Sequence, residues 1–123
     1  MSYSKRIGNW AEDEACLHLQ TAGWQIVTRN FHCRGGELDI VAQRDKHLGF
    51  VEVKYRRSQA MGGALTSITQ QKRQHLIYAA QVFLQRFPKY YEYIARFDLI
   101  CVSGRPQGKL ELQWLTDIFS LTE

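Results

Sequence analysis

Cysteine, proline and repeated segments are scarce in this chain, and their scarcity narrows the kinds of protein to consider. The 123 residues include 3 cysteines and 2 prolines, and no Pro-rich, Gly/Ser-rich or repetitive segment interrupts them. Cys16, Cys33 and Cys101 are odd in number, widely spaced and without a CxxC pair, so they indicate neither a disulfide framework nor a zinc knuckle. The 4 histidines show no ligand spacing such as HxxxH, and we assign them no chemistry.

Long apolar runs are absent as well. No stretch approaches the roughly 18 apolar residues needed to cross a bilayer, and the segment MSYSKRIGNWAEDE lacks the apolar core of a signal peptide. We therefore expect a cytoplasmic protein that does not contact membranes. The length suits one compact domain over residues 1–123, whether monomeric or homodimeric.

Positive charge is in modest excess. Sixteen Lys and Arg residues against 12 Asp and Glu give a formal net charge of +4, which fits a polyanionic partner but does not require one. The basic residues form no tail and cluster instead along the middle of the chain, at Arg29, Arg34, Lys54, Arg56, Arg57 and Lys72. This distribution favours a folded basic cleft over a disordered arm.

Two segments have the periodicity of helices. Between Ser4 and Ala22, small and apolar residues recur at steps of three or four, and Gly23 follows as a helix stop. A second apolar stripe runs from Leu76 to Phe87 before Pro88. Ser67 with Gln70 resembles a capping box at its start, after the loop MGGALTS.

Five segments rich in β-branched and aromatic residues predict strands. They are WQIVTRNF, GELDIVAQ, HLGFVEVKYR, IARFDLICV and KLELQWL. With the two helices, the order is α-β-β-β-α-β-β. Because the second helix is long enough to return the chain in parallel, this order predicts a central mixed β-sheet of about five strands flanked by helices.

The third predicted strand changes character along its length. Alternation places Leu48, Phe50, Glu52, Lys54 and Arg56 on one face, with valines and a tyrosine on the other. A strand buried at its start therefore runs out into a charged cleft. Taken alone, the ExK triplet also fits an ordinary solvated strand.

A second acid lies on the preceding strand. There Glu37 and Asp39 share one face and Leu38, Ile40 and Ala42 the other. Antiparallel pairing can bring Asp39 beside Glu52, where two carboxylates repel each other unless a cation lies between them. Hard oxygen ligands of this kind suit Mg²⁺ or Mn²⁺.

The first predicted helix adds a third acid. Glu12 lies one turn from Gly8, Ala15 and Cys16, so it shares the inward stripe. An acid near a helix start also gains from the helix dipole, and this alternative remains open.

At this point the residues resemble a known pattern. Asp39 followed by Glu52-Val53-Lys54 matches the D…ExK half of the PD-(D/E)xK nuclease signature. Linked motifs across residues 4–102 also resemble those of the bacterial YraN family, namely Gly8–Ala15, Arg29–Asn30, Gly36–Ile40, Phe50–Arg56, Lys72 and Arg96–Asp98.

The resemblance implies a restriction-endonuclease-like α/β fold, similar to that of archaeal Holliday junction resolvases. It implies that Asp39, Glu52 and the Val53 carbonyl bind Mg²⁺ or Mn²⁺, and that Glu12 supports a second metal or an outer-shell water. Lys54 would orient or deprotonate the attacking water. Leu38 stands where the name of the signature has proline, a replacement that leaves the ligand set intact.

Other polar residues receive supporting roles. We expect Glu37 to pair with Arg34 or Arg56 and so to hold the cleft residues in place without binding the metal itself. Phosphate contacts are expected from the basic cluster, that is from Arg29, Arg34, Arg56, Arg57 and Lys72. Gln74 and Tyr78 form a QxxxY pattern that is more often accidental, and Asp98 is expected to form a structural ion pair or strand-end cap.

Together these observations predict a divalent-metal-dependent endonuclease that hydrolyses phosphodiester bonds in DNA. No base-reading motif is visible, so we expect selection for structure, such as branched or junction DNA. Two alternatives remain open at this stage: a non-catalytic nucleic-acid-binding module on the same fold, and an RNA endonuclease.

Overall fold

The computed structural model describes residues 2–57 and 63–121. In this part of the chain, helices and strands follow one another in the order α1, β1, β2, β3, α2, β4, β5. Their bounds are Tyr3–Thr21 for α1, Gln25–Cys33 for β1, Gly36–Arg44 for β2, His47–Arg56 for β3, Gln70–Arg86 for α2, Ile94–Gly104 for β4 and Leu110–Leu115 for β5. Short 3-10 helices, Ala64–Ser67 and Pro88–Tyr90, flank α2. The predicted α-β-β-β-α-β-β order is confirmed.

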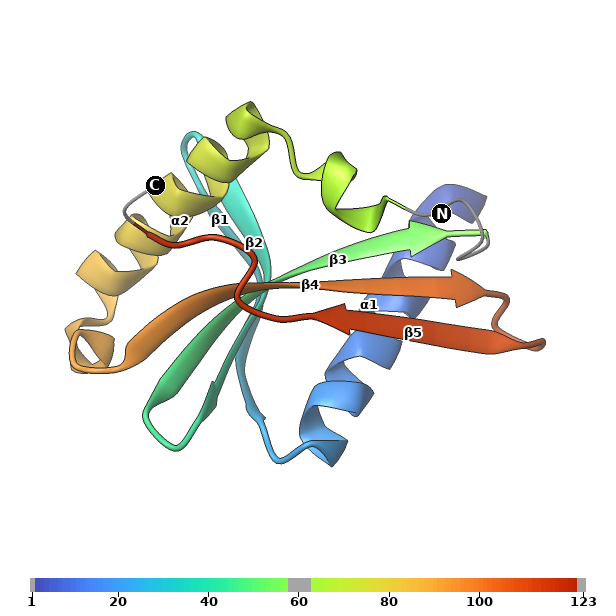
Figure 1. Cartoon of the computed structure of the whole chain (residues 1–123), viewed down its shortest axis with the longest axis horizontal. Coiled ribbons are helices and arrows are strands. Elements are labelled where there is room, and N and C mark those ends of the chain that lie inside the picture. The colour runs from blue at the N-terminus through green and yellow to red at the C-terminus, as the bar shows by residue number, and fades with distance from the viewer. Residues whose placement is uncertain (1, 58–62, 122–123) are drawn as a thin grey trace.

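The strands form one sheet in the order β1-β2-β3-β4-β5. Neighbours are antiparallel except β3 and β4, which are parallel because α2 carries the chain back across the sheet. The helices lie on opposite faces, α1 against β1, β3 and β4, and α2 against β1 and β2 (Figure 1). The prediction of a mixed five-stranded sheet flanked by helices is therefore confirmed.

Two apolar cores hold the layers together, one on each face of the sheet. Phe50 and Phe83 belong to the core under α2, whereas Leu19 and Val51 belong to the core under α1. Neighbouring residues of β3 thus feed opposite cores, as its predicted alternation requires. Among the described residues, no helix is long and apolar enough to span a membrane.

Helix α2 begins differently from the prediction. Its N-cap is Thr69, whose hydroxyl accepts a hydrogen bond from the Lys72 backbone N–H at 3.1 Å. Ser67 closes the short 3-10 helix instead, so the capping box predicted at Ser67 and Gln70 is wrong. In the predicted loop MGGALTS, Met61 and Gly62 lie outside the described residues, and the following residues form that 3-10 turn. An extra turn of backbone hydrogen bonding shifts the helix start by two residues.

The predicted faces of β2 are also partly wrong. Leu38 packs in the core under α2, while Ile40 and Ala42 pack in the core under α1, so the alternation breaks at Asp39. Opposite this point on β1, Asn30 has a left-handed backbone with φ of 54°. Asparagine tolerates that conformation better than most residues. Both strands therefore turn over between the pairs Arg29↔Ile40 and Phe31↔Leu38.

Candidate active site

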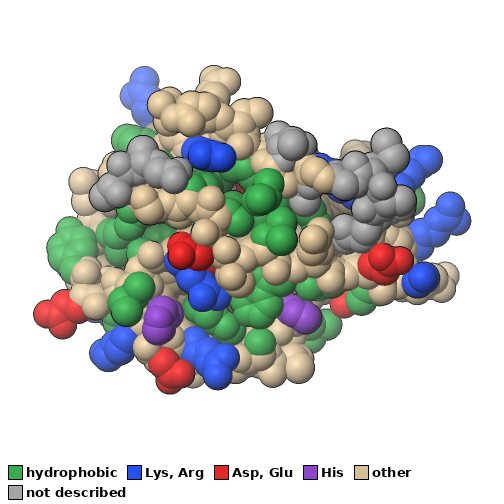
Figure 2. All heavy atoms as spheres, viewed as in Figure 1, with side chains coloured by type: hydrophobic (Ala, Val, Ile, Leu, Met, Phe, Trp, Pro, Cys, Tyr) green, Lys and Arg blue, Asp and Glu red, His purple; other side chains and the backbone are tan. Residues whose placement is uncertain are grey.

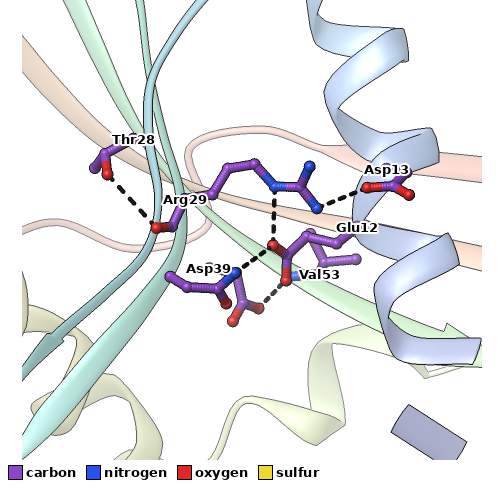
Figure 3. A network of polar contacts seen from close by, with 7 residues as sticks. Glu12, Asp13, Thr28, Arg29, Asp39 and Val53 are labelled. Carbon is purple, nitrogen blue, oxygen red and sulfur yellow. Dashed lines mark hydrogen bonds and ion pairs between the residues drawn. The ribbon is translucent and has the colours of Figure 1, made fainter. Parts of the chain in front are cut away.

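The sheet opens between β2 and β3 where the predicted acids lie. Pairing between these strands ends at Ile40↔Val51, although β3 continues along β4 as far as Arg56↔Ser103. Figure 1 shows β1 and β2 running away from β3 beyond this point. In the gap, the Val53 backbone N–H donates to Asp39 Oδ2 at 2.9 Å (Figure 3). The Asp39 side chain thus satisfies a strand donor that has lost its β2 partner.

Asp39 faces a second carboxylate across this gap. Burial, the hydrogen bonding of Glu52 and the negative charge of Glu52 together raise the pKa of Asp39 to about 9, against the lowering effect of the Val53 N–H. The charge of Glu12 acts in the same upward direction. Without a cation, Asp39 therefore keeps its proton at neutral pH.

Glu52 is neutralised from the other side of the sheet. Lys72 on α2 places its Nζ 2.8 Å from Glu52 Oε2, and only 10% of the Glu52 side chain is exposed. Burial alone would lower the pKa of Lys72, but the hydrogen bond and charge of Glu52, with Asp39 and Glu37 behind it, raise it. Lys72, for which a phosphate contact is predicted, is an ion-pair partner of Glu52 in this structure.

Glu12 reaches the same region from α1. It points inward, as its helical position predicted, and lines a cleft of about 270 Å³ together with Asp39, Val53 and Tyr55. Arg29 Nε, at 3.1 Å, and Asn30 Nδ2, at 3.0 Å, both donate to Glu12 Oε1. Figure 3 shows this acid held between β1 and the Asp39 side chain.

The predicted ligands are close together but do not surround a common point. In the described ranges 2–57 and 63–121, no three Asp, Glu, His or Cys side chains are placed to hold a metal ion. The reason lies in the pairs above, because Glu12 and Glu52 are each turned toward basic partners. Glu12, Asp39 and Glu52 nonetheless supply carboxylate oxygens, which are the ligands that hard divalent cations prefer.

Basic residues extend from Glu52 to the end of β3. Lys54 is exposed beside β4, and Arg56 donates to the Gly63 carbonyl at 3.3 Å. Arg57 is exposed at the strand end. Figure 2 shows Lys and Arg side chains gathered at the same end of the molecule, on the right of the view.

The exposed basic residues at the end of β3 continue into a turn that the sequence prediction did not include; we call the whole set the basic rim. Arg105 and Lys109 are exposed in the β4–β5 turn. This turn lies beside the end of β3, because β3 and β4 are paired in parallel as far as Arg56↔Ser103. The turn sequence Gly-Arg-Pro-Gln-Gly contains Arg105, but only the strand order brings this turn to the end of β3. Asn30 was missed for the same reason, since its contact with Glu12 depends on how α1 packs.

Several predicted roles are not what the structure shows. Arg29 faces α1, where its second nitrogen donates to Asp13 Oδ1 at 2.8 Å, so it is not placed as a phosphate contact. Glu37 pairs with His32, its partner across β1 and β2, at 3.0 Å, and not with Arg34 or Arg56 as predicted. Arg34 is exposed in the β1–β2 turn.

Three further residues lie away from the gap. The Tyr78 ring packs over Gly35 of the β1–β2 turn and Gln74 is exposed, so this pair does not reach Asp39 or Glu52. Asp98 is 1% exposed. It accepts hydrogen bonds from Arg96, from the Trp114 indole and from the Asp117 backbone, which confirms the predicted structural ion pair.

Comparison with known proteins gives a consistent family assignment. Residues 11–102 match the family described as "Uncharacterised protein family UPF0102". A UPF0102 protein of Stutzerimonas stutzeri is 42% identical over 119 residues, covering 97% of this chain and 98% of the relative. Similar proteins of Pseudomonas putida, at 41% over 93% of both chains, and Alcanivorax borkumensis, at 41% over 94% of this chain and 92% of the relative, carry the same family name.

Proposed function

This chain belongs to the uncharacterised protein family UPF0102, and from that premise we propose that it is a divalent-metal-dependent endonuclease acting on DNA. In this proposal the five-stranded sheet is a restriction-endonuclease-like fold of the PD-(D/E)xK type. The substrate is branched or otherwise structured DNA, because basic residues, which suit backbone phosphates, lie beside the site and the sequence has no evident base-reading motif.

One observation carries the proposal: Asp39 and Glu52 share a gap in the sheet, with the pKa of Asp39 raised to about 9. Placing two acids together away from water is costly unless a cation balances them. Mg²⁺ or Mn²⁺ would replace the Asp39 proton, held by the two carboxylates and the Val53 carbonyl, with Glu12 beside them in the cleft. Such an ion supplies a water of lowered pKa and positive charge at the phosphate.

The other residues of the site act on water and phosphate. Lys54 follows Glu52 by two residues on the same face of β3, so its ammonium can orient the attacking water and balance the transition-state charge. Arg56, Arg57, Arg105 and Lys109 extend from it as a basic rim for the flanking backbone phosphates. Lys72, which pairs with Glu52 at 2.8 Å, would supply a further positive charge beside the site.

A cleavage screen tests this function. The protein is incubated with Mg²⁺ or Mn²⁺ and with a four-way junction, a linear duplex of the same sequence, and an RNA hairpin. We expect metal-dependent cutting of DNA, faster on the junction, and none by Glu52→Gln. Faster cutting of the RNA would make the protein an RNA endonuclease.

A second candidate function is a nucleic-acid-binding module without turnover. The observation that favours it is the saturation of Glu12 by Arg29 and Asn30 and of Glu52 by Lys72, which neutralises both acids without a metal. Junction binding with no cleavage under either metal, and equal affinity in Glu52→Gln, would establish this reading over the nuclease.

A further inference from the structure

The contacts of Glu12 divide its two oxygens between different tasks. Arg29 donates to Oε1, as Figure 3 shows, and Asn30 donates to the same oxygen. In the part of the chain that the structure describes, no hydrogen bond engages Oε2. The Glu12 side chain is 12% exposed and lines the cleft together with Asp39 and Val53, which leaves Oε2 as its oxygen without a hydrogen bond in that cleft. One oxygen is fixed while the other remains available to a ligand.

The two donors come from an irregular point of β1. Asn30 has a φ of 54°, and beside it both β1 and β2 turn over. Because of this turn, Arg29 is directed toward α1 and Phe31 toward the core under α2. The same turn places Asp39, opposite Asn30, at the edge of the gap beside β3. One residue therefore shapes the backbone under Asp39 and holds the carboxylate of Glu12.

Arg29 is in turn braced by a second acid. Its Nη2 donates to Asp13 Oδ1 at 2.8 Å, and the Asp13 side chain is 61% exposed, outside the cleft. A planar guanidinium held at two edges cannot rotate freely, so its Nε keeps a fixed direction toward Glu12. These contacts tie α1 to β1 at the level of the candidate site.

From this arrangement we propose that Arg29 and Asn30 are positioning residues, which hold Glu12 Oε1 so that Oε2 points to the divalent cation of the Asp39 site. This proposal rests on the proposed function above, since it concerns the same site. It replaces the phosphate-binding role predicted for Arg29. Partners that orient a metal-binding side chain affect metal affinity by about 10- to 100-fold when they are removed.

The test measures Mn²⁺ binding by calorimetry in variants that separate side chain from backbone. Asn30→Gly keeps the left-handed backbone, because glycine adopts it freely, but loses the amide. We expect Asn30→Gly and Arg29→Ala each to weaken Mn²⁺ binding about 10- to 100-fold. Asp45→Asn, at an exposed acid of the β2–β3 turn outside the cleft, should change it less than about threefold. Thermal unfolding of each variant verifies that it is folded.

A double-mutant cycle makes the role specific to Glu12. In a Glu12→Gln background, Asn30→Gly should have almost no further effect on Mn²⁺ affinity, since the carboxylate that it positions is gone. Equal losses in both backgrounds, or unchanged affinity in folded Asn30→Gly and Arg29→Ala, would overturn the positioning role and leave the nuclease proposal intact. Absence of Mn²⁺ binding by the parent protein would overturn both.

Discussion

Asp98 and Asp39 are both acids set into the sheet, yet their surroundings differ in one decisive respect. Asp98 is 1% exposed and accepts hydrogen bonds from three donors, so its charge is satisfied by the protein itself. Asp39 has one backbone donor and faces Glu52. The first arrangement stabilises the fold, because a buried charge with full partners is fixed in place. In the second arrangement, a proton or a cation is required to balance the two neighbouring carboxylates of Asp39 and Glu52.

The largest effect should come from breaking the satisfied acid. Asp98→Ala leaves the guanidinium of Arg96 and the indole N–H of Trp114 without their acceptor in a buried place. We expect a loss of about 2–4 kcal/mol in the free energy of unfolding. Chemical denaturation measures it, with Asp13→Ala as a control at an exposed acid that should change stability by less than about 0.5 kcal/mol. A loss no larger than that of the control would show that the hydrogen bonds of Asp98 do not stabilise the fold.

The next effect concerns turnover at the unsatisfied site. Lys54→Ala keeps Asp39 and Glu52 but removes the exposed ammonium on the same strand face. We expect single-turnover cleavage to fall by about 100-fold or more, with a much smaller loss of DNA affinity. Single-turnover rates and salt-matched binding on one junction separate the two quantities. Cutting at the parent rate would show that Lys54 has no part in the chemistry.

A smaller effect of opposite sign is expected for stability when Asp39 is replaced. Folding raises the pKa of Asp39 from its ordinary 3.8 to about 9, so between these values the folded state binds a proton that the unfolded chain has released. The free energy of unfolding therefore falls as pH rises from about 4 to about 9. Asp39→Asn removes this cost and should stabilise the metal-free protein by about 1–2 kcal/mol at pH 8, with little change at pH 4.

Denaturation of the metal-free parent and of Asp39→Asn at both pH values tests this sign. Asp98→Asn serves as the matched control, because it replaces one of two acceptor oxygens with an NH2 group that faces a donor, and it should destabilise at both pH values. Destabilisation of Asp39→Asn at pH 8 would mean that the acid is satisfied in the same way as Asp98.

The smallest effect is expected at the basic rim. Arg56→Ala and Arg105→Ala should each weaken DNA binding uniformly across sequences and reduce the slope of log affinity against log salt by about one unit. Binding titrations between low and moderate salt measure that slope. Arg29→Ala, whose side chain faces α1, should leave the slope unchanged. Selective loss for one sequence would point to base contacts instead.

The elements of the fold followed from the sequence because each has a strong local signal. Alternation in β3 and the stripe on α2 fix which side chains are buried, and the long connection through α2 fixes the parallel pair. The face of Leu38 could not be predicted, because it depends on a left-handed Asn30 in a different strand. The alternation of residues along β2 does not show where the strand reverses its two faces.

The acids of the candidate site were also found from the sequence, but their partners were not. The spacing of Glu52 and Lys54 on one strand is a local pattern, and so is the inward stripe that contains Glu12. Lys72 and Asn30 reach those acids through tertiary packing of α2 and β1, which no local spacing encodes. The same limit applies to Arg29, for which the sequence predicts a phosphate contact, whereas the structure pairs it with Glu12 and Asp13 of α1.

Metal binding by the paired acids is the central claim, and calorimetric titration of the parent with Mg²⁺ and Mn²⁺ tests it most directly. Asp39→Asn, Glu52→Gln and the control Asp45→Asn, at an exposed acid outside the cleft, are titrated beside it. The account predicts binding by the parent and by Asp45→Asn, accompanied by proton release near neutral pH, and loss of binding in the other two variants. Equal affinity in all four proteins, or no binding by the parent, would contradict it.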